Sequence, residues 1–283
     1  MNTINTIQDF RIWREKVSGS IGFVPTMGAL HKGHLSLVEA SNNTCQHTVV
    51  SIYLNPAQFS LGEDLNTYPK NLINDLEKLS KYDIGAIFLP TDLEMYPLNY
   101  STYVNESKLS KVLEGKSRQS FFRGVTTVVA KLFNIICPTH AFFGEKDAQQ
   151  LLIIKKMVLD LAYNIQIISC PIIREDSGLS MSSRNIYLSN KMKKSACIIN
   201  NALGSAKQLL LSGERDSQTI RENIINVLKQ ERKLKIDYVS VADGESLNEI
   251  LGEIQNQILV STAVFIGKTR LIDNFSFSLS TNK

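Results

Sequence analysis

The sequence predicts a doubly wound parallel α/β domain over residues 1–175, followed by a smaller α+β domain over residues 176–283. Short, continuous apolar runs alternate with helical patterns through the first two thirds of the chain. Strands that are apolar throughout are typical of a parallel sheet covered by helices on both faces. Beyond residue 175 the order changes, and helices come before strands. The 283-residue chain is 43% hydrophobic and 20% charged, a composition typical of a protein that buries a sizeable core.

The strands and helices of the first domain are predicted from the spacing of apolar residues. β-Branched and aromatic runs predict strands at 21–25, 48–54, 85–90, 140–144 and 165–173. Apolar residues spaced three or four apart predict helices at 34–43, 68–82 and 146–163. They also predict a helix before residue 140 that has Val128, Val129, Leu132, Ile135 and Ile136 on one side. Helices therefore separate successive strands, as they do in parallel β-α-β units.

The second domain is predicted from a different order of elements. Two amphipathic helices are predicted at 190–211 and 216–230, separated by the turn-like stretch SGERD. Two or three strands are then predicted, within 236–243, 257–267 and 269–277. Helices followed by neighbouring strands favour an α+β arrangement over a continuation of the parallel sheet.

Composition and charge exclude several classes of function. The net charge of +4 slightly favours anionic ligands, but the basic residues do not cluster as nucleic-acid binding requires. The four cysteines include no CxxC pair, which predicts buried free thiols rather than a zinc knuckle or a disulfide framework. The N-terminal stretch lacks the apolar core of a signal peptide, and no run approaches the ~18 apolar residues of a membrane span. We therefore expect a cytoplasmic protein with no nucleic-acid or membrane partner.

The stretch PTMGALHKGH (25–34) places two of the chain's four histidines directly after the first predicted strand. In an open parallel sheet, ligands bind beyond the carboxyl ends of the strands. Gly28 and Gly33 allow close approach of the backbone, and the N-terminus of the following helix can bind phosphate. If His34 begins this helix, His31 lies just before it, and both imidazoles can point at one ligand.

These residues alone leave three interpretations of the stretch open: a surface turn, a metal site and a nucleotide site. A metal site is the weaker alternative, because no neighbouring Cys or carboxylate has ligand spacing. If it is a nucleotide site, it is neither a P-loop nor a dinucleotide-binding loop, because the motifs G-x-x-x-x-G-K-[ST] and G-x-G-x-x-G do not occur.

Further motifs indicate a particular enzyme family. HxGH after the first strand resembles the phosphate signature of nucleotidyltransferases related to class I aminoacyl-tRNA synthetases, and GLSMSSRNIYLS (178–189) resembles their second signature. Taken together, seven motifs resemble the pantoate–β-alanine ligase family, and their order over nearly the whole chain argues against coincidence. They are GFVPTMGALHKGHLSLVEAS (22–41), NPAQF (55–59), EDLNTYPK (63–70), FFRGVTTVVAKLFNI (121–135), FGEKDAQQL (143–151), REDSGLSMSSRNIYLS (174–189) and TRLIDN (269–274).

The resemblance implies a ligase of coenzyme A biosynthesis that makes pantothenate in two steps. The pantoate carboxylate attacks the α-phosphorus of ATP, giving pantoyl adenylate and pyrophosphate, and the amine of β-alanine then displaces AMP. The resemblance also implies a Rossmann-like nucleotide domain under a small C-terminal lid, a requirement for Mg²⁺, and a homodimer. Because the nucleophile belongs to the substrate, the protein has to position groups and neutralise charge rather than supply an activated side chain.

The resemblance also assigns the site residues. It makes His34 the proton donor. His31, Lys146 and Arg184 join His34 in the predicted catalytic set because their donor groups suit a phosphoryl group in transfer. Gln58 and Gln150 would hold pantoate, and Gln58 would also border β-alanine, because a neutral amide can both donate and accept hydrogen bonds. The residues expected to contact ATP are Met27, Gly28, Ala29, Leu30, His31, Lys32, Gly33, His34, Gly144, Glu145, Lys146, Asp147, Ile173, Met181, Ser182, Ser183 and Arg184.

The sequence leaves open the role of Asp75, the effect of two departures from the family pattern, and two other functions. Asp75 is either a metal ligand or a helix-surface acid. Ala148 stands where the family often has an aromatic residue, and Lys70 stands where arginine is commoner. Two other functions are also considered: a mononucleotide adenylyltransferase of the same superfamily, and an α/β module that binds nucleotide without chemistry.

Overall fold

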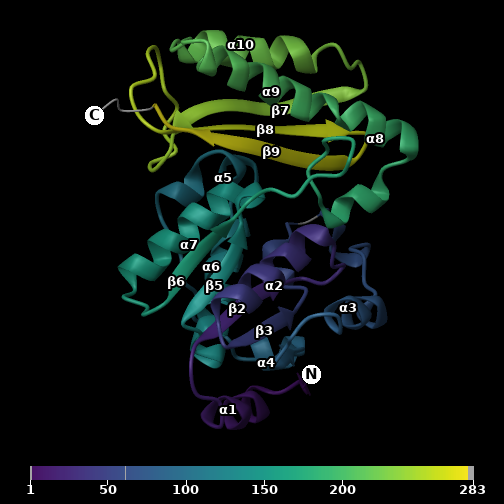
Figure 1. The fold of residues 1–283 in the computed structure, drawn as a ribbon, viewed down its shortest axis with the longest axis vertical. Helices are drawn as coiled ribbons and strands as arrows, with labels where there is room; N and C mark the ends of the chain where they lie inside the picture. Colours follow the sequence, from purple (N-terminus) through teal and green to yellow (C-terminus); the bar gives the residue numbers. More distant parts are fainter. Residues whose placement is uncertain (1, 61, 280–283) are drawn as a thin grey trace. The chain divides into compact units, whose positions relative to one another are not determined.

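The structure, a computed structural model, describes residues 2–60 and 62–279 and divides into two compact units (Figure 1). The first comprises Met1–Glu145 with Gln150–Ile173, and the second comprises Lys146–Gln149 with Arg174–Lys283. Each unit has its own sheet and its own apolar core. Nowhere in the described ranges does a helix combine the length and the hydropathy that crossing a membrane requires.

The first unit is built on the predicted parallel sheet. In its described residues, six strands lie in the order β1-β4-β3-β2-β5-β6, and each pairs in parallel with its neighbours. The strands are β1 (Asn2–Ile4), β2 (Ile21–Thr26), β3 (His47–Ile52), β4 (Ala86–Phe88), β5 (His140–Gly144) and β6 (Gln166–Cys170). The direction in which strands are added reverses between β2 and β5, which makes this position the topological switch point.

Helices cover both faces of this sheet, because consecutive side chains of a strand point to opposite sides. Phe23 and Val49 belong to the buried cluster that includes α6, whereas their neighbours Val24 and Val50 belong to the cluster that includes α2. Burial on both faces explains why these strands are apolar throughout. The helices of the first unit are α1 (Ile7–Glu15), α2 (Lys32–Thr44), α3 (Leu72–Leu79), α4 (Asp92–Met95), α5 (Glu114–Ser117), α6 (Phe121–Ile136) and, from Gln150 on, α7 (Ala148–Asp160).

The second unit is the predicted α+β arrangement. In its described part, β7 (Leu234–Asp243), β8 (Ile258–Ile266) and β9 (Thr269–Phe277) form an antiparallel sheet in sequence order. The helices α9 (Ile198–Leu211) and α10 (Ser217–Leu228) pack on this sheet, as Figure 1 shows. Their apolar sides share one buried cluster with alternate residues of the strands, including Ile258, Val260 and Val264 of β8.

Several boundaries differ from the sequence prediction. The helix predicted at 190–211 is two helices, α8 (Asn190–Ala196) and α9, because Cys197 N bonds to Lys194 O, a tighter bond that interrupts the helical ladder. The helix predicted from residue 146 begins at Ala148, after a 3-10 turn. All four cysteines are free, but Cys137 is exposed, so the expectation of burial is wrong for this thiol.

Two helical glycines should respond oppositely to replacement by alanine. A Cβ at Gly124 of α6 would lie 2.2 Å from Ala57 O, so the turn that carries Gln58 would have to move. A Cβ at Gly204 of α9 would meet nothing within 4 Å. We expect Gly124→Ala to lower the free energy of unfolding by about 1–3 kcal/mol through overpacking. Gly204→Ala, the control, should raise it by roughly 0.5–1 kcal/mol because alanine favours the helix interior.

Denaturant titration of both variants measures this difference. A Gly124→Ala variant as stable as Gly204→Ala would contradict the close packing of α6 against the turn at Ala57.

Candidate active site

The candidate site of the first unit lies at the carboxyl edge of its sheet, around the switch point between β2 and β5 (Figure 1). Residues 27–34 follow β2, and Gly144 ends β5. Gln58 lies in the 3-10 turn Pro56–Gln58 after β3, and Ile173 follows β6. The sheet therefore brings these predicted residues to one edge, where ligands bind in folds of this kind.

The turn after β2 has a left-handed backbone at two successive residues. Gly28 has a φ of +83° and Ala29 a φ of +51°. Glycine adopts this conformation without steric cost, whereas it costs other residues roughly 1–2 kcal/mol. Such a turn persists only where surrounding groups hold it.

Asp75 and Lys78 of α3 hold this turn, and we call these two side chains with residues 28–30 the turn clasp. Asp75 Oδ2 accepts a hydrogen bond from Ala29 N at 2.8 Å, and Oδ1 accepts one from Leu30 N at 2.7 Å. One helical turn later, Lys78 Nζ donates to Leu30 O at 2.6 Å. Asp75 is only 1% exposed, so its interpretation as a helix-surface acid is wrong.

The same geometry does not support the metal role predicted for Asp75. Each of its carboxylate oxygens accepts a backbone N–H group. Across residues 2–60 and 62–279, no group of three or more His, Cys, Asp or Glu side chains is arranged to hold a metal ion. The described residues therefore do not fit a metal site built by the protein alone, and the carboxylate binds the backbone instead.

His31 and His34 cap the N-terminus of α2. His31 Nδ1 accepts from Gly33 N at 3.1 Å, and His34 Nδ1 accepts from His31 N at 3.4 Å. The helix begins at Lys32, so the expectation that His34 begins it is wrong, and His34 lies in its first turn. The ring centroids are 4.0 Å apart.

The capping bonds also fix which nitrogen of each ring carries the proton. Because Nδ1 of both rings is an acceptor, the proton of each neutral imidazole is on Nε2. His31 and His34 therefore present N–H donors at the N-terminus of α2, where the helix dipole favours an anion. This arrangement is suited to binding phosphate.

The side chain of Gln58 is oriented by Asn55. Asn55 Nδ2 donates to Gln58 Oε1 at 2.8 Å and to Gly124 O at 3.1 Å, while Tyr96 Oη donates to Asn55 Oδ1 at 2.9 Å. Since the amide oxygen of Gln58 is an acceptor, its NH₂ group is the end that can donate to a carboxylate. Asn55 is 1% exposed and was not among the predicted residues. An asparagine directly before a proline, which favours a turn, was the available signal.

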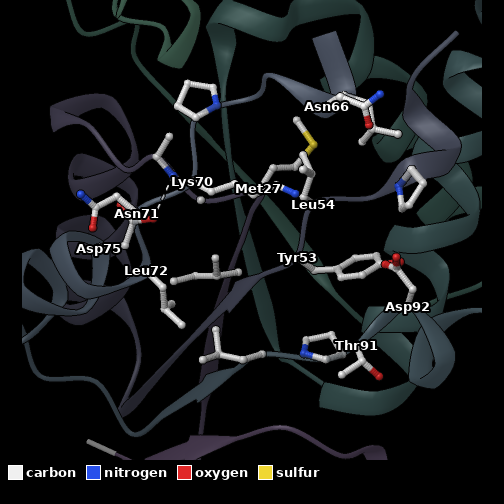
Figure 2. A pocket seen from close by; sticks show the side chains of 18 residues that line it. Met27, Tyr53, Leu54, Asn66, Lys70, Asn71, Leu72, Asp75, Thr91 and Asp92 are labelled. Carbon is white, nitrogen blue, oxygen red and sulfur yellow. Dashed lines mark hydrogen bonds between the residues drawn. The ribbon is translucent and has the colours of Figure 1, made fainter. Parts of the chain in front are cut away.

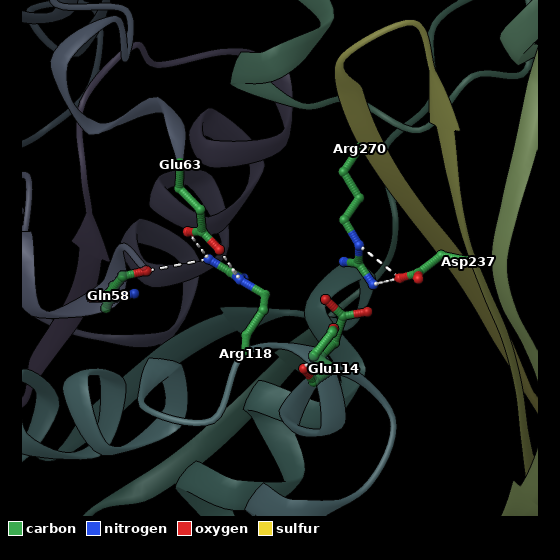
Figure 3. A network of polar contacts seen from close by, with 7 residues as sticks. Gln58, Glu63, Glu114, Arg118, Asp237 and Arg270 are labelled. Atoms are coloured by element: carbon green, nitrogen blue, oxygen red, sulfur yellow. Dashed lines mark hydrogen bonds and ion pairs between the residues drawn. The ribbon is translucent and has the colours of Figure 1, made fainter. Parts of the chain in front are cut away.

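Arg118 holds the backbone of the same turn (Figure 3). It donates through Nε and Nη2 to the two carboxylate oxygens of Glu63, each at 2.7 Å, and through Nη2 to Gln58 O at 3.2 Å. The guanidinium also lies over the ring of Phe121, 3.7 Å from its centroid. Sequence reasoning missed Arg118 and Glu63, because nothing in a single sequence indicates that positions 55 residues apart are paired.

A hollow of about 530 Å³ adjoins the turn clasp (Figure 2). The predicted residues Met27, Gly28 and Asp75 line it, and so does Lys70, one of the departures from the family pattern. Tyr53 also lines it, and burial raises the pKa of this phenol, which stays neutral. The turn after β2, which is predicted to bind nucleotide, therefore forms part of the wall of this hollow.

Residues that follow β5 belong to different units. Gln150, predicted to hold pantoate, is half-buried in the first turn of α7 and belongs to the first unit. Lys146 and Asp147 lie in the preceding 3-10 turn and belong to the second unit. Lys146 Nζ lies 3.8 Å from Asp147 Oδ1, a long contact for an ion pair.

The second unit carries the predicted residues Met181–Arg184, all half-buried. Ser182 caps the 3-10 turn Ser183–Tyr187, because its Oγ accepts from Arg184 N at 3.3 Å. The next residue, Asn185, is 5% exposed and donates to Ser180 O at 3.1 Å. A buried amide therefore fixes the backbone of this loop.

The profile of the family described as pantoate-beta-alanine ligase matches residues 2–276 of this chain. The chain belongs to this family. A pantothenate synthetase of Clostridium botulinum (strain 657 / Type Ba4) is 48% identical over 283 residues, which cover 99% of this chain and 100% of that protein. A pantothenate synthetase of Acetivibrio thermocellus is 49% identical over 277 residues, which cover 97% of this chain and 98% of that protein.

Solved structures of pantoate–β-alanine ligases share the fold. The pantothenate synthetase of Thermus thermophilus aligns with a TM-score of 0.92 at 35% identity, over 97% of this chain and 99% of that chain. The pantoate–β-alanine ligase of Francisella tularensis, complexed with β-γ ATP and β-alanine, aligns with a TM-score of 0.79 at 34% identity, over 97% of both chains. The predicted fold class, family and enzyme class are confirmed.

Removal of the Asp75 carboxylate should release the turn after β2. We expect Asp75→Ala to lower the free energy of unfolding by about 2–4 kcal/mol, since the N–H groups of half-buried Ala29 and buried Leu30 lose a charged acceptor. Asp75→Asn keeps one acceptor and should lose less. Denaturant titration measures both variants, with Glu77→Gln, an exposed position on the same helix, as the control.

The metal role makes a different prediction. If Mg²⁺ without nucleotide raised the unfolding temperature of the parent protein but not of Asp75→Asn, Asp75 would be a metal ligand after all.

Proposed function

We propose that this protein is an ATP-dependent ligase that condenses pantoate with β-alanine to pantothenate through pantoyl adenylate, releasing AMP and pyrophosphate. The observation that supports this most directly is the family match over residues 2–276. The donors predicted to act on the phosphates, His31, His34, Lys146 and Arg184, also suit this chemistry, and the resemblance assigns His34 as the proton donor. A mononucleotide adenylyltransferase is not favoured, because the relatives that match nearly the whole chain are pantothenate synthetases.

In the first step, a carboxylate oxygen of pantoate bonds to the α-phosphorus of ATP. The bond between that phosphorus and the oxygen that bridges it to the β-phosphorus breaks, and pyrophosphate leaves. Negative charge develops on the phosphate oxygens and on the leaving group. His31 and His34 donate their Nε2–H groups to this charge at the N-terminus of α2. Lys146 and Arg184 add positive charge.

Gln58 and Gln150 hold pantoate for this attack. The Asn55 amide fixes the oxygen end of Gln58, so the NH₂ end donates to the pantoate carboxylate. A neutral amide orients the carboxylate without neutralising its charge, and the carboxylate therefore remains nucleophilic. Positioning of this kind is a large part of what an enzyme contributes when both reacting groups belong to substrates.

In the second step, the neutral amine of β-alanine, bordered by Gln58, attacks the acyl carbon of the adenylate. A C–N bond forms, the C–O bond to AMP breaks, and the nitrogen loses a proton. Water would compete for the same carbon. We therefore assign residues 1–175 to binding ATP and pantoate, and residues 176–283 to a lid. Ser182, Ser183 and Arg184 of this lid would bind the triphosphate in the first step, and the lid would then exclude water from the adenylate.

The remaining expectations are also proposals. Mg²⁺ would enter with ATP, held mainly by the phosphates, since this ion commonly binds through substrate phosphates with few protein ligands. Of the other ATP contacts, Asp147 would lie on the ribose side and Ile173 beside adenine. We propose a homodimer in the cytoplasm, which light scattering and cell fractionation would check.

Isotope exchange between pyrophosphate and ATP tests the proposed function. Because adenylate formation precedes amine attack, exchange should occur with pantoate and Mg²⁺ and should not require β-alanine. Exchange driven by a mononucleotide acceptor and not by pantoate would identify an adenylyltransferase. Absence of exchange with every acid would favour a binding module without chemistry.

Replacement of His34 tests the role of its Nε2–H donor. In His34→Asn, the amide oxygen can replace the Nδ1 acceptor that caps α2, while the Nε2 donor is lost. We expect adenylate formation to fall by about 10²–10³-fold, the effect of losing a donor from a preorganised site. The unfolding temperature and pantoate binding should stay near those of the parent. His34→Gln places an amide near the Nε2 position and should retain more activity.

His47→Ala is the matched control, since this histidine contacts Ser18 O from the start of β3 and has no proposed part in the chemistry. It should form adenylate at the parent rate. If His34→Asn did the same, the HKGH stretch would be a helix cap and nothing more.

A further inference from the structure

The TRLIDN motif (269–274) has no part in the chemistry proposed above, yet two adjacent polar residues of it are buried in β9. Asp273 is 2% exposed and Asn274 is 6% exposed. A buried carboxylate or amide costs free energy unless partners satisfy it. Asp273 binds Arg174, in the segment that leads into Ser182–Arg184, and Asn274 binds the backbone of Lys146. Lys146 and Ser182–Arg184 are the proposed phosphate-binding residues of the second unit.

Asp273 binds the segment that leads into Ser182–Arg184. Arg174 Nη1 donates to Asp273 Oδ2 at 2.6 Å, and Nη2 donates to Oδ1 at 3.0 Å. The same Nη1 donates to Gly178 O at 3.1 Å. Two parallel bonds between a guanidinium and a carboxylate fix direction as well as distance. Arg174 therefore ties the turn at Gly178 to β9.

From this turn the contacts continue to the loop. Ser180 forms an antiparallel bridge with Arg174, and its Oγ donates to Ile272 O at 3.4 Å. On the other side of the loop, Asn185 Nδ2 donates to Ser180 O at 3.1 Å. Ser182–Arg184 thus lie between two residues whose positions are fixed to each other and to β9.

Asn274 binds the other segment. Its Nδ2 donates to Lys146 O at 2.8 Å, across 128 residues of sequence. The backbone N–H group of Asn274 donates to Asp273 Oδ1 at 2.9 Å. The Asp273 carboxylate therefore accepts hydrogen bonds from both Arg174 and Asn274. This contact agrees with the grouping of Lys146–Gln149 with the second unit, although that segment follows β5.

We infer that Asp273 and Asn274 are positioning residues that hold Lys146 and Ser182–Arg184 at a fixed separation on one compact unit. The inference rests on the proposed function, in which both segments bind the triphosphate. Donors stabilise a phosphoryl group in transfer only where its charge develops. Two segments that are distant in sequence need a common support to meet that condition, and adjacent residues of β9 provide it.

Three variants test the inference, each removing one part of the support. Asp273→Asn removes the charge, Arg174→Lys keeps the charge but loses the second parallel bond, and Asn274→Ala removes the donor to Lys146 O. We expect each to slow adenylate formation by about 10–100-fold, because a displacement of about 1 Å in a reacting geometry can cost that much. The discharge of supplied pantoyl adenylate by β-alanine should stay near the parent rate, because pyrophosphate has already left at that stage.

Hydrogen exchange gives a readout that does not depend on activity. Amides of residues 178–185 should exchange faster in Asp273→Asn and Arg174→Lys than in the parent, and should be unchanged in Asn274→Ala. Glu249→Gln, which removes the ion pair between Arg221 of α10 and the segment before β8, is the control and should match the parent in both half-reactions. If Asp273→Asn fails to fold, the other two variants carry the test.

The inference is overturned if Arg174→Lys and Asn274→Ala form adenylate at the parent rate. It is also overturned if both half-reactions slow equally, since that result indicates a general loss of structure. Failure of the proposed function would look different, because the parent protein itself would then show no pantoate-dependent exchange.

Discussion

The Asp75 carboxylate is the contact on which the nucleotide edge of the first unit depends, because it accepts both N–H groups of a turn that is left-handed at two successive residues. That turn leads directly into the cap of α2. There His31 accepts a hydrogen bond from Gly33 N, and His34 accepts one from His31 N. If the turn moved, the helix N-terminus and both imidazoles would move with it. A single buried acid thus holds in place the segment that we propose binds phosphate.

The other proposed binding groups are supported in the same way, by buried polar side chains from distant parts of the chain. Asn55 and Arg118 fix the side chain and the backbone of Gln58, and Asp273 fixes the loop before Ser182. A reaction between two substrates needs no activated nucleophile on the protein, so its demand falls on geometry. The structure meets that demand with hydrogen bonds behind the binding residues, where substitution disturbs position rather than chemistry.

The sequence was sufficient to predict the parallel sheet, the α+β unit and the family, because continuous apolar runs and ordered motifs are local patterns. It was not sufficient to predict β1, which has three residues, or the break at Cys197 between α8 and α9. The backbone contacts of Asp75 were not predicted, because its partners Ala29 N and Leu30 N are 46 and 45 residues away in the sequence. A histidine pair in place of the usual Ser/Thr and Glu likewise concealed the capping box of α2. Polar contacts leave no period in the sequence, whether the partners are 46 residues apart, as in the Asp75 contacts, or three, as in this capping box.

The division of the chain also has a consequence for the order in which the protein becomes competent during synthesis. The backbone passes from the first unit to the second at Lys146, returns at Gln150, and leaves again at Arg174. Lys146 leaves the ribosome 128 residues before Asn274, its partner in the last strand. A nascent chain can therefore complete the parallel sheet early while its proposed phosphate-binding lysine still lacks a support, and a chain truncated before β9 would never acquire it.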